Sequence, residues 1–337
     1  MGESTAHRVS LLNRNDKPFH VVISQQFERD SIDSLCNLAD MMRNIGESKE
    51  GIQFLKSLLS HKRAMLYFTQ PSTRTFLSFA AACQIVGIPY NEVRDASVSS
   101  EVKGETESDT VRVLSQYFDV IIMRHPGEGF AEAMARRLDI PIINGGSGKD
   151  QHPTQALLDV YTLKRCFKGD LGKKTITFVG DLKRGRTVRS LSYLLCKYPQ
   201  IKLNLVAPSD LQMEDDILEY LLERGVKWEK YSKLTDELIG ESDAVYMTRL
   251  QDEWGETEFN YDDFSISKSH TPLFKPNMVI LHPLPRRNEL DRDLDDTPHA
   301  KYWDQVQNGM WMRAAILASV FGVDSQIMTY FYEVYSR

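Results

Sequence analysis

The sequence predicts an α/β fold built on parallel sheets, in one large or two medium domains. A length of 337 residues allows either arrangement. Short apolar runs alternate with longer amphipathic segments, which is typical of βαβ units. The expected strands are 64–68, 120–123, 141–144, 175–180, 202–207, 244–248 and 278–281. The expected helices include 105–118, 153–166, 188–197 and 215–224.

Composition and charge exclude several classes of partner. Hydrophobic residues make up 42% of the chain and charged residues 26%, which is ordinary for a globular protein. The net charge is -6 and the sequence pI is about 5.8. We therefore expect no nucleic acid and no anionic membrane as partner. A cluster of cations at one place would be local and specific.

Cysteine usage and the N-terminus indicate a reduced, cytoplasmic protein. The four cysteines, Cys36, Cys83, Cys166 and Cys196, are widely spaced and form no C-x-x-C pair, so neither a disulfide framework nor a zinc site is expected. The N-terminus lacks a signal-peptide core, and Ala6 occupies the position where myristoylation wants Ser or Thr. No apolar run approaches the ~18 residues of a membrane span.

Polar residues, mostly with an arginine among them, follow five of the expected strands. The segments are STRT at 72–75, RHP at 124–126, GDLKRGR at 180–186, Arg249, and His282 with Pro283. Open parallel sheets bind ligands outside the carboxyl ends of their strands. Together the five placements predict a convergent cationic site.

The segment PSTRT, at 71–75, lies between an expected strand and an apolar-spaced segment. Helix N–H groups, hydroxyls and the Arg74 guanidinium are the donors that a phosphate dianion needs. An ordinary helix cap would need Ser or Thr but not Arg74. The Walker pattern G-x-x-x-x-G-K-[ST] is absent from this turn.

Two further segments can be interpreted either as ordinary structural elements or as parts of a functional site. The polar stretch 97–106, which contains Ser99 and Lys103, reads as a loop before a helix, and Lys103 matters only if that loop covers a site. QHPTQ places His152 at a helix start, before a proline at the favoured first position. A neutral imidazole there could donate to a carbonyl oxygen, or the histidine could simply cap the helix.

Two arginine-bearing segments suggest carboxylate binding. FVGDLKRGR resembles the βα turn of a nucleotide-binding fold but lacks G-x-G-x-x-G, which argues against a dinucleotide. Arg186 in that segment offers a two-pronged donor for a carboxylate. Arg249 and Gln251, in YMTRLQ, could hold a second carboxylate. The alternative for each arginine is a surface salt bridge.

These motifs, taken in order, resemble the aspartate carbamoyltransferase family of transcarbamylases. They are PSTRT, RHPGEG, HPTQALLD, GDLKRGRTV with YMTRLQ, and HPLPR. The resemblance runs from about 31 to 322. It implies a carbamoyl-phosphate-binding domain over 1–152, completed by a C-terminal helix at 309–337 that packs back on it, and an amino-acid-binding domain over 153–308. It also implies a homotrimer with shared active sites, and leaves open larger assemblies with regulatory or dihydroorotase chains.

The resemblance also implies roles for single residues. Ser72, Thr73, Arg74 and Thr75 would bind the phosphate, while Thr75, Arg124 and His152 would polarise the carbamoyl oxygen and Gln155 would hold its nitrogen. Arg186, Arg249 and Gln251 would bind the carboxylates of the acceptor. Ser99 and Lys103 would come from the adjacent subunit, with Lys103 bridging both substrates. The backbone around Pro283 and Leu284 would accept hydrogen bonds from the reacting groups. No metal or cofactor is implied.

The chain departs from the family pattern at several positions. The family's acidic residue before STRT is Gln70 here, and the final arginine of YMTR-x-Q-x-E-R is Trp254. These two positions form an ion pair in the family, so both charges are missing together. Phe76 follows STRT in place of a polar residue, and Arg184 and Arg189 stand beside Arg186.

Three alternatives to carbamoyl transfer to aspartate follow. The acceptor could be another amino acid or amine, because of Gln70 and Trp254. The ornithine branch is disfavoured, because it carries HCLP where this chain has HPLP. An inactive homologue serving as an assembly subunit is disfavoured too, because Arg74, Lys103, Arg124, His152 and Arg186 are all retained.

Overall fold

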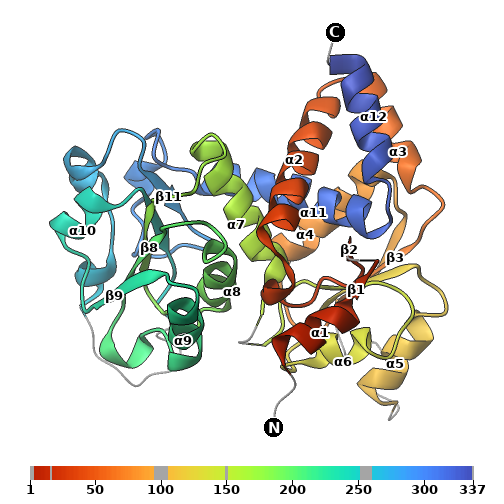
Figure 1. The fold of residues 1–337 in the computed structure, drawn as a ribbon, viewed down its shortest axis with the longest axis horizontal. Coiled ribbons are helices and arrows are strands. Elements are labelled where there is room, and N and C mark those ends of the chain that lie inside the picture. Colours follow the sequence, from red (N-terminus) through yellow and green to blue (C-terminus); the bar gives the residue numbers. More distant parts are fainter. Residues whose placement is uncertain (1–3, 16, 95–104, 149–150, 251–259, 336–337) are drawn as a thin grey trace. The chain divides into compact units, whose positions relative to one another are not determined.

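A computed structural model describes residues 4–15, 17–94, 105–148, 151–250 and 260–335. The chain forms two compact units (Figure 1). The first comprises Met1–Leu158 and Asn308–Arg337, and the second comprises Asp159–Gln307. The sequence places the boundaries at 152/153 and 308/309, whereas the units divide within α7 (Pro153–Cys166) and α11 (Tyr302–Val320). Both unit boundaries fall inside a helix, where the sequence has no turn residues to mark them.

The first unit is built on a parallel sheet with the strand order β4-β3-β5-β6. The strands are β3 (Ala64–Phe68), β4 (Tyr90–Val93), β5 (Val120–Arg124) and β6 (Ile142–Asn144). Every residue of β3, β5 and β6 is buried, as expected for parallel strands covered on both faces. The order reverses between β3 and β5, and ligands of open sheets bind at such a point.

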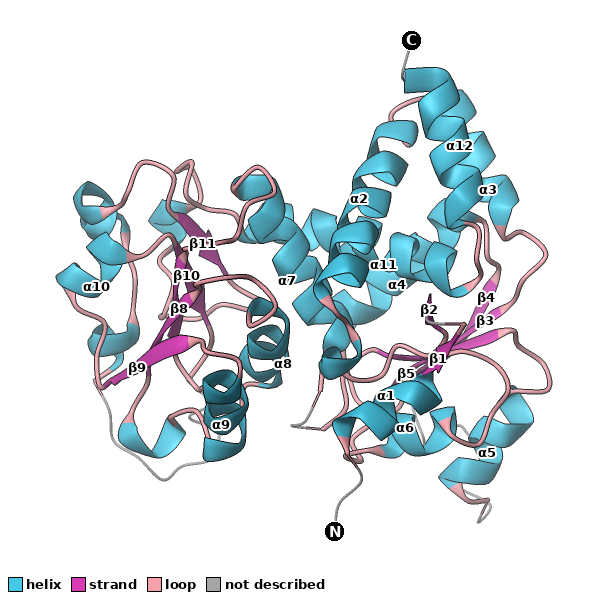
Figure 2. Cartoon of the chain, in the orientation of Figure 1, coloured by secondary structure: helices cyan, strands magenta, loops and turns pink. Residues whose placement is uncertain are grey.

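Helices cover both faces of this sheet. They are α1 (Thr5–Leu12), α2 (Arg29–Ile45), α3 (Lys49–Leu58), α4 (Thr73–Val86), α5 (Glu107–Leu114) and α6 (Phe130–Ala135). Figure 2 shows α1, α5 and α6 on one side and α2, α3 and α4 on the other. On the α5–α6 side, Tyr67 and Met123 of the sheet share a buried cluster with Val111 and Met134. A short antiparallel pair, β1 (Asn13–Arg14) and β2 (Lys17–Pro18), follows α1.

The C-terminal helices return to the first unit. In α12 (Asp324–Tyr335), Tyr330 stacks on Phe54 of α3 with ring centroids 4.0 Å apart, and the Tyr335 hydroxyl donates to the Asn44 carbonyl at 2.9 Å. This confirms that the C-terminal helix packs back on the first domain. Within the described ranges no single helix is long and apolar enough to cross a membrane. The pair α11 and α12 passes that test only jointly, with a bend of 118° between them.

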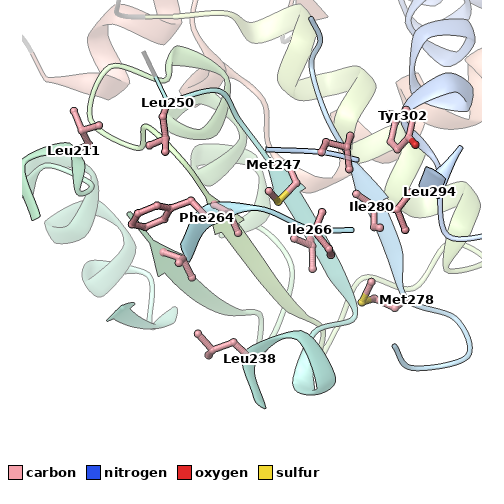
Figure 3. Packing of buried hydrophobic residues seen from close by; sticks show 14 residues of the cluster. Leu211, Leu238, Met247, Leu250, Phe264, Ile266, Met278, Ile280, Leu294 and Tyr302 are labelled. Carbon is pink, nitrogen blue, oxygen red and sulfur yellow. The ribbon is translucent and has the colours of Figure 1, made fainter. Parts of the chain in front are cut away.

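The second unit contains a five-stranded parallel sheet in the order β11-β10-β7-β8-β9. Its strands are β7 (Thr175–Val179), β8 (Lys202–Val206), β9 (Lys227–Tyr231), β10 (Ala244–Met247) and β11 (Val279–Leu281), and its other helices are α8 (Arg186–Leu195), α9 (Asp215–Glu223) and α10 (Asp236–Glu241). One face packs on Phe264, Ile266, Leu294 and Tyr302 (Figure 3). The order reverses between β7 and β10. The predicted α/β class, with two parallel sheets flanked by helices, is confirmed.

All the expected strands are present within one residue of their predicted bounds, but β4 and β9 of the two parallel sheets were missed, as was the short pair β1 and β2. In β9 the sequence KWEKY has no fully buried residue, and β4 is likewise exposed in part. Both are edge strands, where one side of the ladder has no neighbour and polar residues are common. The expected helix 105–118 was too long, because α5 ends at Leu114.

Candidate active site

The PSTRT motif occupies the turn between β3 and α4, at the reversal point of the first sheet. Ser72 is the N-cap residue of α4, yet its side chain makes no capping hydrogen bond. Thr73 and Arg74 are exposed, whereas Thr75 is buried. The first N–H groups of a helix have no partner within the helix and favour an anion. This turn can therefore offer N–H, hydroxyl and guanidinium donors to a phosphate, and capping alone does not account for Ser72.

Three of the expected functional side chains gather around Gly145 and Gly146, which follow β6. A methyl group placed on the α carbon of Gly146 would lie 2.8 Å from Nη1 of Arg124 and 3.3 Å from Nε2 of His152. One placed on Gly145 would lie 3.5 Å from Cγ2 of Thr75. The two glycines thus let the backbone approach side chains from β5, from α4 and from the start of α7. The sequence did not predict this role for the glycines, although the pair directly after a strand was a usable signal.

Hydrogen bonds from Asn144 and Arg124 fix the shape of this glycine turn. The side-chain oxygen Oδ1 of Asn144 accepts from the Gly146 N–H at 2.8 Å and from the Ser147 hydroxyl at 2.9 Å, and its Nδ2 donates to the Val22 carbonyl at 3.1 Å. Nη1 of Arg124 donates to the Gly145 carbonyl at 3.1 Å. Arg124 is 8% exposed, so its orientation is set by burial as well as by this bond.

His152 and Gln155 belong to the start of α7, as predicted. Pro153 is the first residue of the helix, and His152 immediately precedes it. The His152 carbonyl accepts the N–H groups of Gln155 and Ala156 at 3.0 and 3.1 Å. His152 is buried and Gln155 half-buried. The histidine side chain faces the glycine turn, because its Nε2 is near the position of a Gly146 methyl group.

In the second unit, the ends of β7 and β10 meet at the reversal point of that sheet. The Thr248 N–H and hydroxyl both donate to the Val179 carbonyl, at 2.8 and 3.1 Å. Gly180 has a φ of +120°, and a methyl group there would lie 2.2 Å from the Thr248 carbonyl oxygen. Only glycine permits this approach. The loops that carry Arg186 and Arg249 therefore begin side by side.

Arg186 is the first residue of α8 and is half-buried. Burial lowers its pKa to about 10, so the guanidinium remains protonated at neutral pH. A buried guanidinium attracts a carboxylate more strongly than an exposed one, because less water screens the charge. Arg249 follows β10 and is also half-buried.

The two arginines that flank Arg186 are not equivalent to it. Nη2 of Arg189 lies 2.5 Å from the Asp216 carboxylate, and Nη1 lies 3.1 Å from that of Glu214. Arg189 therefore anchors the start of α9. The backbone N–H of Arg184 donates to the buried Asp181 carboxylate at 2.8 Å, which shapes the turn before α8.

Pro283 and Leu284 follow β11, the edge strand beside β10. Leu284 has a φ of +55°, which is rare for a residue other than glycine. Its N–H donates to Nδ1 of His282 at 2.7 Å. Four other predicted positions, Ser99, Lys103, Gln251 and Trp254, lie outside the described residues. Across the described ranges, no three His, Cys, Asp or Glu side chains group as metal ligands.

Comparison with known proteins finds two family domains in the chain. Residues 20–165 match the carbamoyl-P binding domain of aspartate/ornithine carbamoyltransferases, and residues 172–320 match their Asp/Orn binding domain. The chloroplastic aspartate carbamoyltransferase 1 of Pisum sativum is 41% identical over 303 residues, covering 88% of this chain and 77% of that protein. The aspartate carbamoyltransferase catalytic subunit of Clostridium novyi is 44% identical over 261 residues, covering 76% and 85%.

Solved structures of aspartate transcarbamoylase from Trypanosoma cruzi share the fold. The crystal structure in complex with carbamoyl phosphate and aspartate has a TM-score of 0.80 and 39% identity, covering 89% of this chain and 95% of that one. The complex with carbamoyl aspartate and phosphate has a TM-score of 0.81 and 39% identity, with the same coverage.

Proposed function

This chain belongs to the aspartate/ornithine carbamoyltransferase family, and we propose that it transfers the carbamoyl group of carbamoyl phosphate to the amine of L-aspartate. The products are N-carbamoyl-L-aspartate and phosphate, as in de novo pyrimidine synthesis. The observation that carries the proposal is the grouping of Thr75, Arg124 and His152 around Gly145 and Gly146, next to the phosphate-type turn. The relatives in Trypanosoma cruzi with bound substrates and products support the choice of reaction.

The first unit supplies the groups that hold and activate carbamoyl phosphate. Ser72, Thr73 and Arg74 bind the phosphate, with Thr75 at the start of α4 reaching toward the carbamoyl oxygen. Arg124 and His152 donate to that oxygen, and Gln155 holds the carbamoyl nitrogen. Donors fixed in place before the reaction are worth ~3–4 kcal/mol each when the oxyanion forms. Arg124 meets this requirement, because burial and its bond to Gly145 already orient it.

The second unit supplies the groups that hold the acceptor. Arg186 binds the α-carboxylate of aspartate, and Arg249 with Gln251 binds the side-chain carboxylate. Two carboxylate-binding arginines favour a dicarboxylic amino acid over ornithine, whose side chain is cationic. The backbone of Pro283 and Leu284 accepts hydrogen bonds from the carbamoyl nitrogen and the attacking amine.

The chemistry needs only these fixed groups. The neutral amine nitrogen forms a bond to the carbamoyl carbon, the carbonyl becomes a tetrahedral oxyanion, and the bond from carbon to the phosphate oxygen then breaks. The leaving phosphate takes the proton that the amine loses, so no side chain has to act as general base. Holding two reactants in attack geometry can contribute ~7–11 kcal/mol.

We further propose a homotrimer in which Ser99 and Lys103 act in the site of the adjacent subunit. The sequence predicts a cytoplasmic location. The relative in Pisum sativum is chloroplastic by name. The trimer is tested by light scattering, and the shared site by mixing inactive Lys103→Ala and Arg124→Ala chains. Mixed trimers should regain activity only if one native site can form from two chains.

The function is tested by phosphate release from carbamoyl phosphate across a panel of amino acids headed by L-aspartate. We expect turnover with aspartate. The Arg74→Ala variant should lose turnover but still fold. Turnover with a different amine alone would support the alternative raised by Gln70 and Trp254. Retained turnover in Arg74→Ala would refute the phosphate assignment.

A further inference from the structure

His282, the residue directly after β11, uses both of its ring nitrogens inside the second unit. Nδ1 lies 2.7 Å from the Leu284 N–H, and Nε2 lies 2.8 Å from Oε1 of Glu289. The exposed fractions of His282 and Glu289 are 1% and 4%. The sequence marked His282 only as part of HPLP, and Glu289, seven residues later, was not predicted to matter.

These contacts determine the tautomer of the histidine. A backbone N–H can only donate, so Nδ1 must carry the lone pair, and Nε2–H must donate to Glu289. Burial lowers the pKa of His282 below its ordinary value and favours the neutral ring; the bond and charge of Glu289 oppose this shift, while the charges of Arg286 and Arg249 add to it. Burial opposes ionisation of Glu289, but bonds from His282 and the Arg287 N–H hold its pKa below the ordinary value.

A second chain of hydrogen bonds holds the same backbone from the other side. The His282 N–H donates to Oε1 of Gln305 at 3.0 Å, and Nε2 of Gln305 donates to Asp159 at 2.6 Å. The Tyr246 hydroxyl donates to the other oxygen of Asp159 at 2.7 Å. All these side chains are buried. The network joins the end of β11 to β10, the strand that precedes Arg249.

The backbone that this network holds is not one the chain would adopt alone. Leu284 has a φ of +55°, a left-handed conformation that costs leucine about 1–2 kcal/mol. Such conformations persist where surrounding contacts impose them, and they cluster at functional positions. The Leu284 N–H bond to His282 is one contact that holds this conformation.

We propose that His282 is a positioning residue which, through its bond to Leu284 and with Glu289 behind it, fixes the Pro283–Leu284 backbone in the orientation that carbamoyl transfer requires. This inference rests on the proposed function. It adds the buried side chains that orient the backbone groups to the backbone groups that contact the substrates. If the pair were only structural, its loss would lower stability without changing the turnover of folded protein.

Two substitutions of His282 separate its two bonds. An asparagine oxygen reaches the position of Nδ1 and can accept from Leu284, but it does not reach Glu289. A glutamine amide reaches the position of Nε2 and can donate to Glu289, but it offers nothing to Leu284. We expect the kcat of His282→Gln to fall by about 100-fold. The kcat of His282→Asn should fall by only about tenfold. The aspartate KM should change little in either variant.

The controls separate positioning from folding. The dissociation constant of inorganic phosphate, measured by calorimetry, reports on the Ser72–Thr75 turn of the first unit and should stay unchanged. If His282→Gln does not fold, Glu289→Ala and Glu289→Gln replace it. Alanine removes the acceptor and should lower kcat, while glutamine retains an acceptor oxygen and should restore it.

Equal losses in His282→Asn and His282→Gln would overturn the inference, as would unchanged kcat in both Glu289 variants. A wild-type protein that forms no carbamoylated product would contradict the proposed function, and this inference with it. An active wild type with unaffected variants would contradict the inference alone.

Discussion

Arg124 and His152 converge on the same glycine: a methyl group on Gly146 would lie 2.8 Å from Nη1 of Arg124 and 3.3 Å from Nε2 of His152. The two side chains come from the end of β5 and the start of α7, and 28 positions of sequence separate them. A side chain at position 146 would therefore crowd both of these donors.

Gly146→Ala should lower kcat/KM for carbamoyl phosphate by about 100-fold, because the methyl group would displace Arg124 or His152 from the carbamoyl oxygen. Its φ of +112° adds a backbone cost of about 1–3 kcal/mol, which thermal unfolding would record. Steady-state kinetics at saturating aspartate measures the catalytic effect.

Gly129→Ala is the matched control for the backbone cost. Gly129 also has a positive φ, +71°, but no atom lies within 4 Å of a methyl group placed there. It should also lose stability, but keep its kcat/KM for carbamoyl phosphate. Equal kinetic losses in both variants would show that strain, and not the crowding of Arg124 and His152, is responsible.

Arg186→Ala should raise the aspartate KM by about 10- to 100-fold, because a charged hydrogen bond to a carboxylate is worth about 1.5–3 kcal/mol. The carbamoyl phosphate KM should stay close to wild type. Arg189→Ala is the control in the same helix, since Arg189 already pairs with Glu214 and Asp216. An equal rise in aspartate KM for both variants would contradict the assignment of Arg186.

The double variant Gln70→Glu with Trp254→Arg introduces the two charges that the family pattern predicts at these positions. We expect it to change the aspartate KM more than the carbamoyl phosphate KM. Each single variant should be less active than the double variant, because one unpartnered charge costs more than a matched pair. Equal shifts of both Michaelis constants would argue against a role of these positions in acceptor binding.

His20 makes the stability of the first unit depend on pH. Burial lowers its pKa to about 4, with the charge of Arg14 adding to the effect, and Nδ1 accepts the Ile142 N–H at 3.1 Å. The unfolded chain takes up this proton near pH 6.5 and the folded chain only near pH 4. Stability is therefore full above pH 6.5 and falls, by up to about 3 kcal/mol, as the pH drops to 4.

His20→Asn should remove this part of the slope, because an asparagine oxygen can accept the same N–H and does not titrate. Urea unfolding at pH 7 and at pH 4.5 measures this slope. The free energy of unfolding of the wild type, minus that of the variant, should be smaller at pH 4.5 than at pH 7. A gap of constant size would mean that another group sets the acid sensitivity.

The sequence predicted the central strands well because their burial on both faces leaves an unbroken apolar run, as in AMLYF at 64–68. It missed β9, because at the sheet edge KWEKY carries charges that a central strand would not tolerate. The turn at STRT and the helix start after His152 could be placed from the sequence, because a turn or a helix start is a local signal. Gly146 and Glu289 were missed because their importance comes from contacts with residues far along the chain or on the next loop.

Carbamoyl transfer to L-aspartate can be measured by following both products at once. Purified protein is supplied with carbamoyl phosphate and L-aspartate, and N-carbamoyl-L-aspartate is quantified by mass spectrometry alongside released phosphate. We expect the two products to appear in equal amounts and both to vanish in Arg124→Ala. Phosphate released without carbamoylaspartate, or equal product from Arg124→Ala, would contradict the proposed reaction.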